Sequence, residues 1–218
     1  MNTTPSSKVI LLRHAESIKN IKKIHGGLGE ALTDNGIQQA RNIASRIKTI
    51  TTPGHLKIYT STSNHTRYTA EIIAESLKIK VEPPFDFRPL HLGIADGVSE
   101  DELMLKNPEV HMLFQQWRSR RIDIKELKVP EMEDYMDFWA RGENIIKHLS
   151  NDSDNVLVCS NSLMILLVHY MLGNHPQLSN NYKHFSIDNC GMVVFNTQDY
   201  KQFIINKNES TIELDWIV

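Results

Sequence analysis

The sequence predicts an α/β protein, a single three-layer domain with a mostly parallel central sheet flanked by helices. Two observations support this fold class. Short apolar runs alternate with amphipathic stretches of helical period, as expected where helices connect parallel strands. Further strand-like runs then close the sequence, and no linker, repeat or low-complexity segment divides it.

In the first half of the chain, strands and helices alternate. Val9–Leu12 is a short aliphatic run typical of a buried strand, and Leu56–Thr60 is a second. Thr33 is a suitable N-cap for a helix, because apolar residues follow it at spacings of three and four (Ile37, Ala40, Ile43, Ala44 and Ile47). Thr66–Leu77 has the pattern of the next helix.

The second half is expected to continue the alternation and to end in strands. The predicted helices are Glu100–Leu105, Pro108–Arg118, the long amphipathic segment Glu131–Leu149, and Leu163–Leu172. The predicted strands are Val156–Cys159, Met192–Phe195, Gln202–Ile205 and Ile212–Ile217, the last three joined by turns at 197–199 and 206–210.

The 218 residues carry a formal charge of −2, and 40% of them are hydrophobic. Such a chain can bury one sizeable core, so we expect one domain over residues 8–218 after a disordered tail over residues 1–7. The chain has no dominant basic stripe, which argues against general nucleic-acid binding. Cys159 and Cys190 both lie in apolar, strand-like runs, which favours free thiols in a reducing compartment. Since the longest apolar stretch is too short to span a bilayer, we expect a cytoplasmic protein with no membrane partner.

The segment Arg13-His14-Ala15-Glu16-Ser17 directly follows the first predicted strand. In open α/β sheets, ligands bind at the carboxyl ends of the strands. Imidazole can attack phosphorus and carry the phosphoryl group covalently, and a neighbouring guanidinium can hold phosphate oxygens in a bidentate grip. Arg13 and His14 are therefore candidate catalytic residues for phosphoryl transfer. The alternative is an ordinary strand end with a surface Arg-His pair.

The stretch from Leu11 to Asn20 resembles the signature of the histidine phosphatase superfamily, which includes the cofactor-dependent phosphoglycerate mutases. Other segments resemble further landmarks of this family in the same order: residues 32–40, 59–73, 93–97, 133–141 and 156–160. As an ordered set, these landmarks are more specific than any one alone. The resemblance implies a phosphoglycerate mutase-like domain, and we expect no cofactor.

In this family one histidine is phosphorylated, two arginines and a second histidine surround the phosphate, and a carboxylic acid protonates the leaving oxygen. The resemblance assigns the nucleophile to His14 and the first arginine to Arg13. Asn20 matches a side-chain donor to the phosphate, with a turn residue after the loop as the alternative.

Three of the family's other groups are replaced in this chain. His65 stands at the position of the second arginine, with Arg67 two residues later on another helical face; a surface histidine at a helix start is the alternative for His65. The second histidine is replaced by Asn161, which can bond to phosphate but carries no charge, and whose position also suits a helix N-cap. The acid is replaced by Pro89, which has no side-chain proton to donate.

Other candidate groups give weaker signals. Asp86, His91 and Asp96 are the nearest substitutes for the acid, although a loop residue is the favoured interpretation of each. The basic cluster Trp117–Arg121 would either recruit an anionic substrate or form a solvated helix end, and we favour the helix end. No His-Glu-x-x-His or Cys-x-x-Cys pattern is present, so we expect no metal site.

We therefore predict a phosphatase-like enzyme that acts on a small phosphorylated metabolite by phosphoryl transfer to His14, with weakened or altered catalysis. Arg13, Asn20, His65, Asn161 and Arg67 are the expected phosphate-binding side chains. The main alternative is a catalytically inactive protein on the same fold that binds an anion or a protein partner, and a remoter one is a pocket repurposed for other chemistry. Mutase activity is less expected than hydrolysis, because it needs a second phosphate site.

Overall fold

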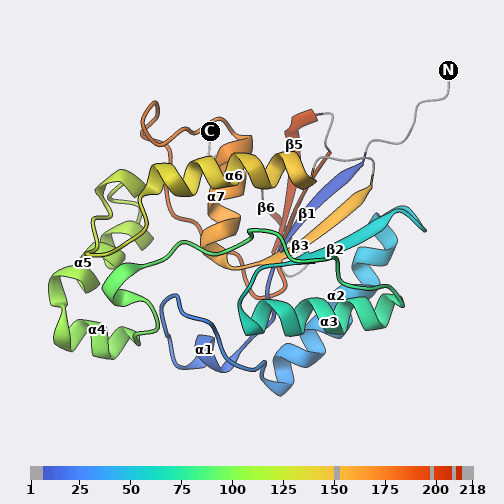
Figure 1. Cartoon of the computed structure of the whole chain (residues 1–218), viewed down its shortest axis with the longest axis horizontal. Helices are drawn as coiled ribbons and strands as arrows, with labels where there is room; N and C mark the ends of the chain where they lie inside the picture. Colours follow the sequence, from blue (N-terminus) through green and yellow to red (C-terminus); the bar gives the residue numbers. More distant parts are fainter. Residues whose placement is uncertain (1–6, 150–152, 197–198, 208–209, 213–218) are drawn as a thin grey trace.

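A six-stranded sheet in the order β2-β3-β1-β4-β5-β6 forms the centre of the protein (Figure 1). The structure is a computed structural model that describes residues 7–149, 153–196, 199–207 and 210–212. The strands are β1 (Lys8–Arg13), β2 (Leu56–Thr60), β3 (Asp154–Cys159), β4 (Met192–Asn196), β5 (Asp199–Lys207) and β6 (Ser210–Ile212). β2, β3 and β1 run parallel, and β4, β5 and β6 extend the sheet through antiparallel pairs.

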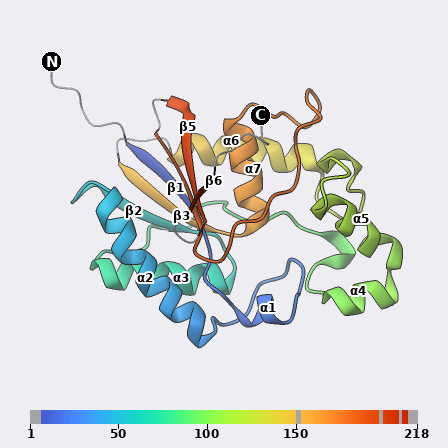
Figure 2. The ribbon, with the colours of Figure 1, turned by 180° about the vertical axis from the view of Figure 1, so that it is seen from behind.

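Helices pack on both faces of this sheet. Within the described residues they are α1 (Ile18–Ile21), α2 (Asp34–Ile50), α3 (Asn64–Leu77), α4 (Glu100–Lys106), α5 (Pro108–Arg118), α6 (Tyr135–Leu149) and α7 (Asn161–Met171), with the short 3₁₀ helices η1 (Gly93–Ala95) and η2 (Ile124–Glu126). α2 and α3 cover one face, while α6 and α7 cover the other (Figure 2). The predicted α/β architecture is confirmed.

The alternating side chains of β1 contribute to two separate cores. Val9 and Leu11 belong to the core that contains α6 and α7, whereas Ile10 and Leu12 pack with apolar residues of α2 and α3. All four are fully buried. A strand that is covered on both faces needs apolar residues at every position, which explains the continuous aliphatic run in the sequence.

α2 begins where the sequence predicts. The Oγ1 of Thr33 accepts a hydrogen bond from the backbone N–H of Gly36 at 2.9 Å and caps the helix. A Cβ at position 36 would lie 2.0 Å from the carbonyl oxygen of Glu16. Glycine is therefore what lets the start of α2 pack against the loop that follows β1.

The predicted start of the long helix at Glu131 is wrong, because α6 begins at Tyr135. Glu131 has a φ of +62°, which an α-helix cannot contain. Met132 forms an isolated bridge with Leu92, and the N–H of Glu133 donates to the carbonyl of His91 at 3.1 Å. Backbone pairing with the loop at 91–92 thus takes precedence over the helical periodicity of residues 131–134.

The structure also bears on the predictions for the two cysteines, for the last strands and for membrane-spanning helices. Cys159 is fully buried in β3, but Cys190 lies in the turn before β4 with a φ of +57°, so its predicted strand-like setting is wrong; both thiols are free. Gln202–Ile205 falls inside β5, and residues 1–6, 197–198, 208–209 and 213–218 lie outside the described residues. Within the described part, no helix is both long and apolar enough to cross a membrane.

Candidate active site

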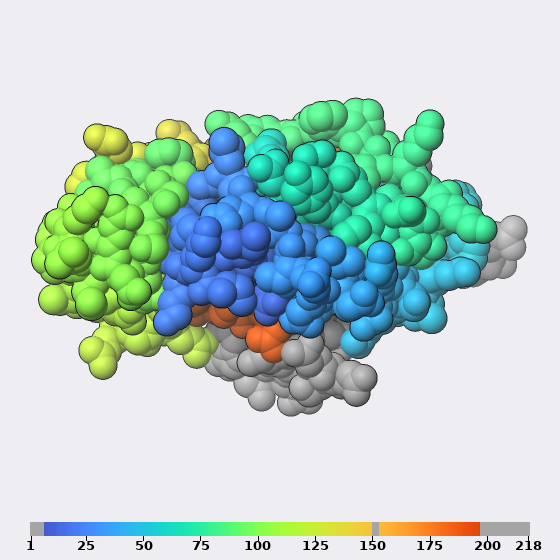
Figure 3. All heavy atoms as spheres, turned by 90° about the horizontal axis from the view of Figure 1, so that it is seen from below, coloured from blue at the N-terminus to red at the C-terminus, as the bar shows by residue number. Residues whose placement is uncertain are grey.

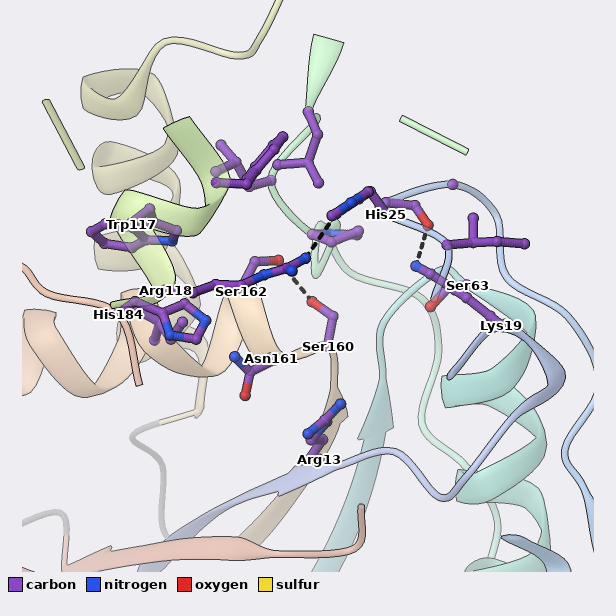
Figure 4. Close-up of a pocket in the computed structure, with 18 of the residues that line it drawn as sticks. Arg13, Lys19, His25, Ser63, Trp117, Arg118, Ser160, Asn161, Ser162 and His184 are labelled. Atoms are coloured by element: carbon purple, nitrogen blue, oxygen red, sulfur yellow. Dashed lines mark hydrogen bonds between the residues drawn. The ribbon is translucent and has the colours of Figure 1, made fainter. Parts of the chain in front are cut away.

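A cavity of about 250 Å³ lies at the carboxyl ends of β1 and β3 (Figure 4). Its walls come from the loop after β1, the first turns of α3 and α7, the end of α5 and the loop before β4. The structure brings five of the sequence-predicted site residues to this cavity: Arg13, His14, Asn20, His65 and Asn161.

His14 is held as a neutral imidazole with a defined orientation. Only 5% of the residue is exposed, and its Nδ1 lies 2.8 Å from the carbonyl oxygen of Ala15. Since a carbonyl only accepts, Nδ1 carries the proton and Nε2 keeps its lone pair. Burial, followed by the nearby His65 and Arg13, lowers the pKa of His14 well below its usual value. The neutral ring, with a free lone pair on Nε2, is therefore the favoured form at neutral pH, as a nucleophile requires.

Arg13 is fixed by the loop that precedes β4. Its guanidinium donates to the carbonyl of Ile187 and, at 3.4 Å, to the hydroxyl of Ser186. Burial lowers the pKa of Arg13, and the nearby Asp188 opposes that shift. The buried Nε has no hydrogen-bond partner among the described residues. A donor of this kind is what an oxyanion in the cavity would satisfy.

His65 is 1% exposed, so the alternative of a surface histidine is wrong. It lies in the first turn of α3, and its ring centroid is 4.1 Å from that of His14 with the planes at 63°. Burial and the positive charges of Lys19 and Arg13 lower the pKa of His65 to about 3. The position of the family's second arginine therefore holds a neutral ring.

Asn20 and Asn161 reach the cavity but have structural partners. The Oδ1 of Asn20 accepts from the N–H and the hydroxyl of Ser17, at 3.0 and 2.9 Å, and so caps α1. Asn161 donates to the carbonyl of Phe185 at 2.9 Å and accepts from the N–H of Ile187 at 3.4 Å. It is the first residue of α7 and not its N-cap, which is Ser160.

Arg67 is the predicted site residue that the structure does not bring to the cavity. It lies on the outer face of α3, where it pairs with Glu71 at 3.0 Å and covers the ring of Tyr68. Its side chain is 48% exposed. The two-residue offset from His65 turns it about 200° around the helix, away from the sheet.

Pro89 lines the cavity, and none of the three suggested acids joins it there. Asp86 forms an ion pair with Arg88 at 2.6 Å. The Nδ1 of His91 accepts from the N–H of Gly93, and Asp96 accepts from the N–H groups of Gly27 and Leu92. His91 and Asp96 instead line an adjoining hollow of about 550 Å³, which shares Pro89 with the first.

Sequence reasoning missed three basic residues of the cavity, Lys19, His25 and His184, and named a fourth, Arg118, only as part of the basic cluster Trp117–Arg121. Trp117 is buried and Arg118 donates to Glu100 at 2.8 Å and contacts His25 at 3.2 Å. The favoured interpretation of this cluster as a solvated helix end is therefore wrong for Trp117, whereas the side chain of Arg118 is 36% exposed at the end of α5 and also lines the cavity. In the sequence, only the basic and aromatic character of Trp117 and Arg118 indicated a possible binding role, because their place in the cavity depends on how α5 packs.

The depressed basicity of His65 predicts that acid destabilises the fold. The unfolded imidazole titrates near pH 6.5, whereas burial holds the folded pKa at about 3. Between these values the unfolded chain binds more protons, so this contribution is complete above pH 6.5 and is lost as the pH falls. The free energy of unfolding, measured by urea titration, should decrease from pH 7 to pH 4, by at most about 1.4 kcal/mol per pH unit for this group. His65→Gln should show a shallower slope, and an unchanged slope would contradict the assignment.

The sequence model of the histidine phosphatase superfamily (branch 1) matches residues 9–210, so the chain belongs to this superfamily. Fructose-2,6-bisphosphatase of Saccharomyces cerevisiae is 29% identical over 179 residues, which cover 81% of this chain and 37% of that protein. The first three curated relatives are matched over only 21–37% of their own length.

Solved structures share the fold. A mycobacterial glucosyl-3-phosphoglycerate phosphatase, solved with VO₃, has a TM-score of 0.70 at 20% identity and matches 87% of this chain and 90% of its own. Phosphoserine phosphatase of Entamoeba histolytica, solved with 3-phosphoglyceric acid, has a TM-score of 0.67 at 20% identity, over 97% and 100% of the two chains. The predicted superfamily and fold are confirmed, and the names of these proteins agree with the predicted class of enzyme.

Proposed function

We propose that the protein hydrolyses a small phosphorylated metabolite with His14 as the phosphoryl acceptor. The observation that carries this proposal is the state of His14: a buried, neutral ring whose Nδ1 proton is engaged by Ala15, beside Arg13. A surface residue would not need this orientation. Relatives named for sugar and glycerate phosphates support the same substrate class.

The reaction would proceed in two steps. The Nε2 lone pair of His14 attacks phosphorus, and the bond from phosphorus to the alcohol oxygen breaks as the N–P bond forms. Water then attacks phosphorus, the N–P bond breaks, and inorganic phosphate leaves with the imidazole restored. Arg13 would hold the equatorial oxygens as charge develops on them. The departing alkoxide takes its proton from water, because Pro89 has none to give.

We further propose that catalysis is weakened or altered. A missing general acid costs about 10²–10⁴ in rate, and one missing donor costs about 10²–10³, although such losses do not add within one site. The neutral His65 and the Asn161 amide, which is bonded to the loop at 185–187, support this expectation.

The same observations favour one alternative function, the catalytically inactive anion-binding protein. The helix starts of α3 and α7, together with Arg13, suit an anion whether or not turnover occurs. Nothing in this arrangement specifically favours a protein partner. Mutase activity is less expected, because it requires a well-held phosphohistidine and a second phosphate site.

Trapping of the phosphoenzyme tests the proposal. The protein is mixed briefly with a panel of phosphate esters, quenched in alkali to preserve phosphohistidine, and analysed by mass spectrometry. We expect one added phosphoryl group on His14 with at least one ester. Binding of orthovanadate without any phosphate on His14 would instead identify the inactive anion-binding protein.

A further inference from the structure

The geometry points to Lys19 as a phosphate-binding residue, whose ammonium supplies the positive charge that His65 and Asn161 do not. This inference rests on the proposed phosphate site at His14. Lys19 was not among the residues that the sequence motif assigns to the phosphate, and it lies one position before Asn20 in α1.

The position of Lys19 is fixed by its own helix and by the next loop. The hydrogen bonds between Ser17 and Asn20 hold the first turn of α1, and the Nζ of Lys19 donates to the carbonyl of Gly26. That loop is held in turn by the bond from the N–H of Gly27 to Asp96 at 2.8 Å. In the space-filling view, the first part of the chain (blue) is packed between the α4–α5 segment (yellow-green) and the α3 segment (teal) (Figure 3).

The charge of Lys19 acts on the groups around the phosphoryl site. It lowers the pKa of His65 more than Arg13 does, and it also lowers the pKa of His14. Lys19 also lines the same cavity as both rings. Figure 4 shows Arg13, Lys19 and Arg118 entering the cavity from three different elements.

Arg13 is one cation of the cavity, and its guanidinium is already hydrogen-bonded to the loop before β4. His14 and His65 are neutral, and Arg118 is paired with Glu100 at 2.8 Å. Among the described residues, Lys19 forms no ion pair with a carboxylate within 4.0 Å. Burial lowers its pKa to about 8, with Asp96 opposing that shift, so it remains mainly protonated at neutral pH. A partly buried ammonium without a carboxylate partner is stabilised when a phosphate enters.

The competing explanation is that Lys19 only anchors the loop through Gly26. Lys19→Gln separates the two roles, because its amide keeps a hydrogen-bond donor on a side chain one bond shorter but carries no charge. Lys19→Met removes both the donor and the charge, and Lys19→Arg keeps the charge. Lys22→Gln is the matched control, since Lys22 lies in the same segment, is 57% exposed and pairs with Glu30 at 3.3 Å.

The experiment measures orthovanadate binding by calorimetry, with melting temperatures to verify folding, and phosphate-ester turnover as a second readout. Loss of one charge-assisted hydrogen bond should weaken orthovanadate binding about 10- to 100-fold in Lys19→Gln and Lys19→Met. Lys19→Arg should remain within about threefold of the wild type, as should Lys22→Gln.

Each outcome decides the inference. Wild-type affinity in Lys19→Gln would overturn it and leave only the anchoring role, and so would the absence of orthovanadate binding by the wild type. Phosphate on His14 together with unchanged binding in Lys19→Gln would reject the inference while the proposed hydrolysis stands. Lys19-dependent binding without phosphate on His14 would reject the hydrolysis while the inference stands.

Discussion

His14→Ala should reduce phosphate-ester hydrolysis by at least about 10³-fold, to a background set by the remaining anion-binding groups. The alanine has no nitrogen to accept the phosphoryl group, so no covalent intermediate can form. The neighbouring donors can still bind a phosphate, but they provide only positioning and charge stabilisation. kcat should therefore fall much more than the affinity for orthovanadate.

Single-turnover and steady-state rates with the best ester of the panel would measure this loss. His55→Ala is a suitable control, because His55 is exposed just before β2, at the opposite end of the sheet strands. It should keep full activity. Retention of more than about one tenth of the activity in a folded His14→Ala protein would remove His14 from the chemistry and with it the proposed two-step reaction.

The backbone of this fold follows closely from local signals in the sequence. β2 spans Leu56–Thr60 as predicted, and α2 starts after the Thr33 cap, because apolar runs and capping residues act over a few neighbouring positions. The start of α6 did not follow, since Met132 and Glu133 are paired with the distant loop at 91–92. Tertiary pairing of this kind leaves no local pattern.

The residues of the candidate site also fall into a group that the sequence predicts and a group that only the packing of the fold reveals. His14, Arg13 and Asn20 were predictable because they stand in one continuous motif, and His65 and Asn161 because they follow strands whose carboxyl ends meet. Lys19, Arg118 and His184 reach the cavity only through the packing of α1, α5 and the loop before β4. Their roles depend on side-chain direction and burial, which a single sequence does not encode locally.

Pro89→Glu should raise kcat for esters of ordinary alcohols about 10²-fold or more, by restoring a proton donor for the leaving oxygen. The position suits this change because Pro89 lies where the cavity and the adjoining hollow meet. Its interaction with Arg141 is made by the backbone carbonyl, at 3.4 Å, and does not require the proline ring.

The leaving group provides the decisive comparison. A nitrophenolate ion departs without a proton, so nitrophenyl phosphate should gain little from Pro89→Glu, whereas an alkyl phosphate should gain strongly. Pro89→Gln is the matched control, because it makes the same backbone change and has similar size but no acidic proton. An equal gain in both variants would assign the effect to loop flexibility after loss of the proline ring. No gain with any alkyl ester, in a folded variant that still binds orthovanadate, would mean that the missing proton does not limit this site.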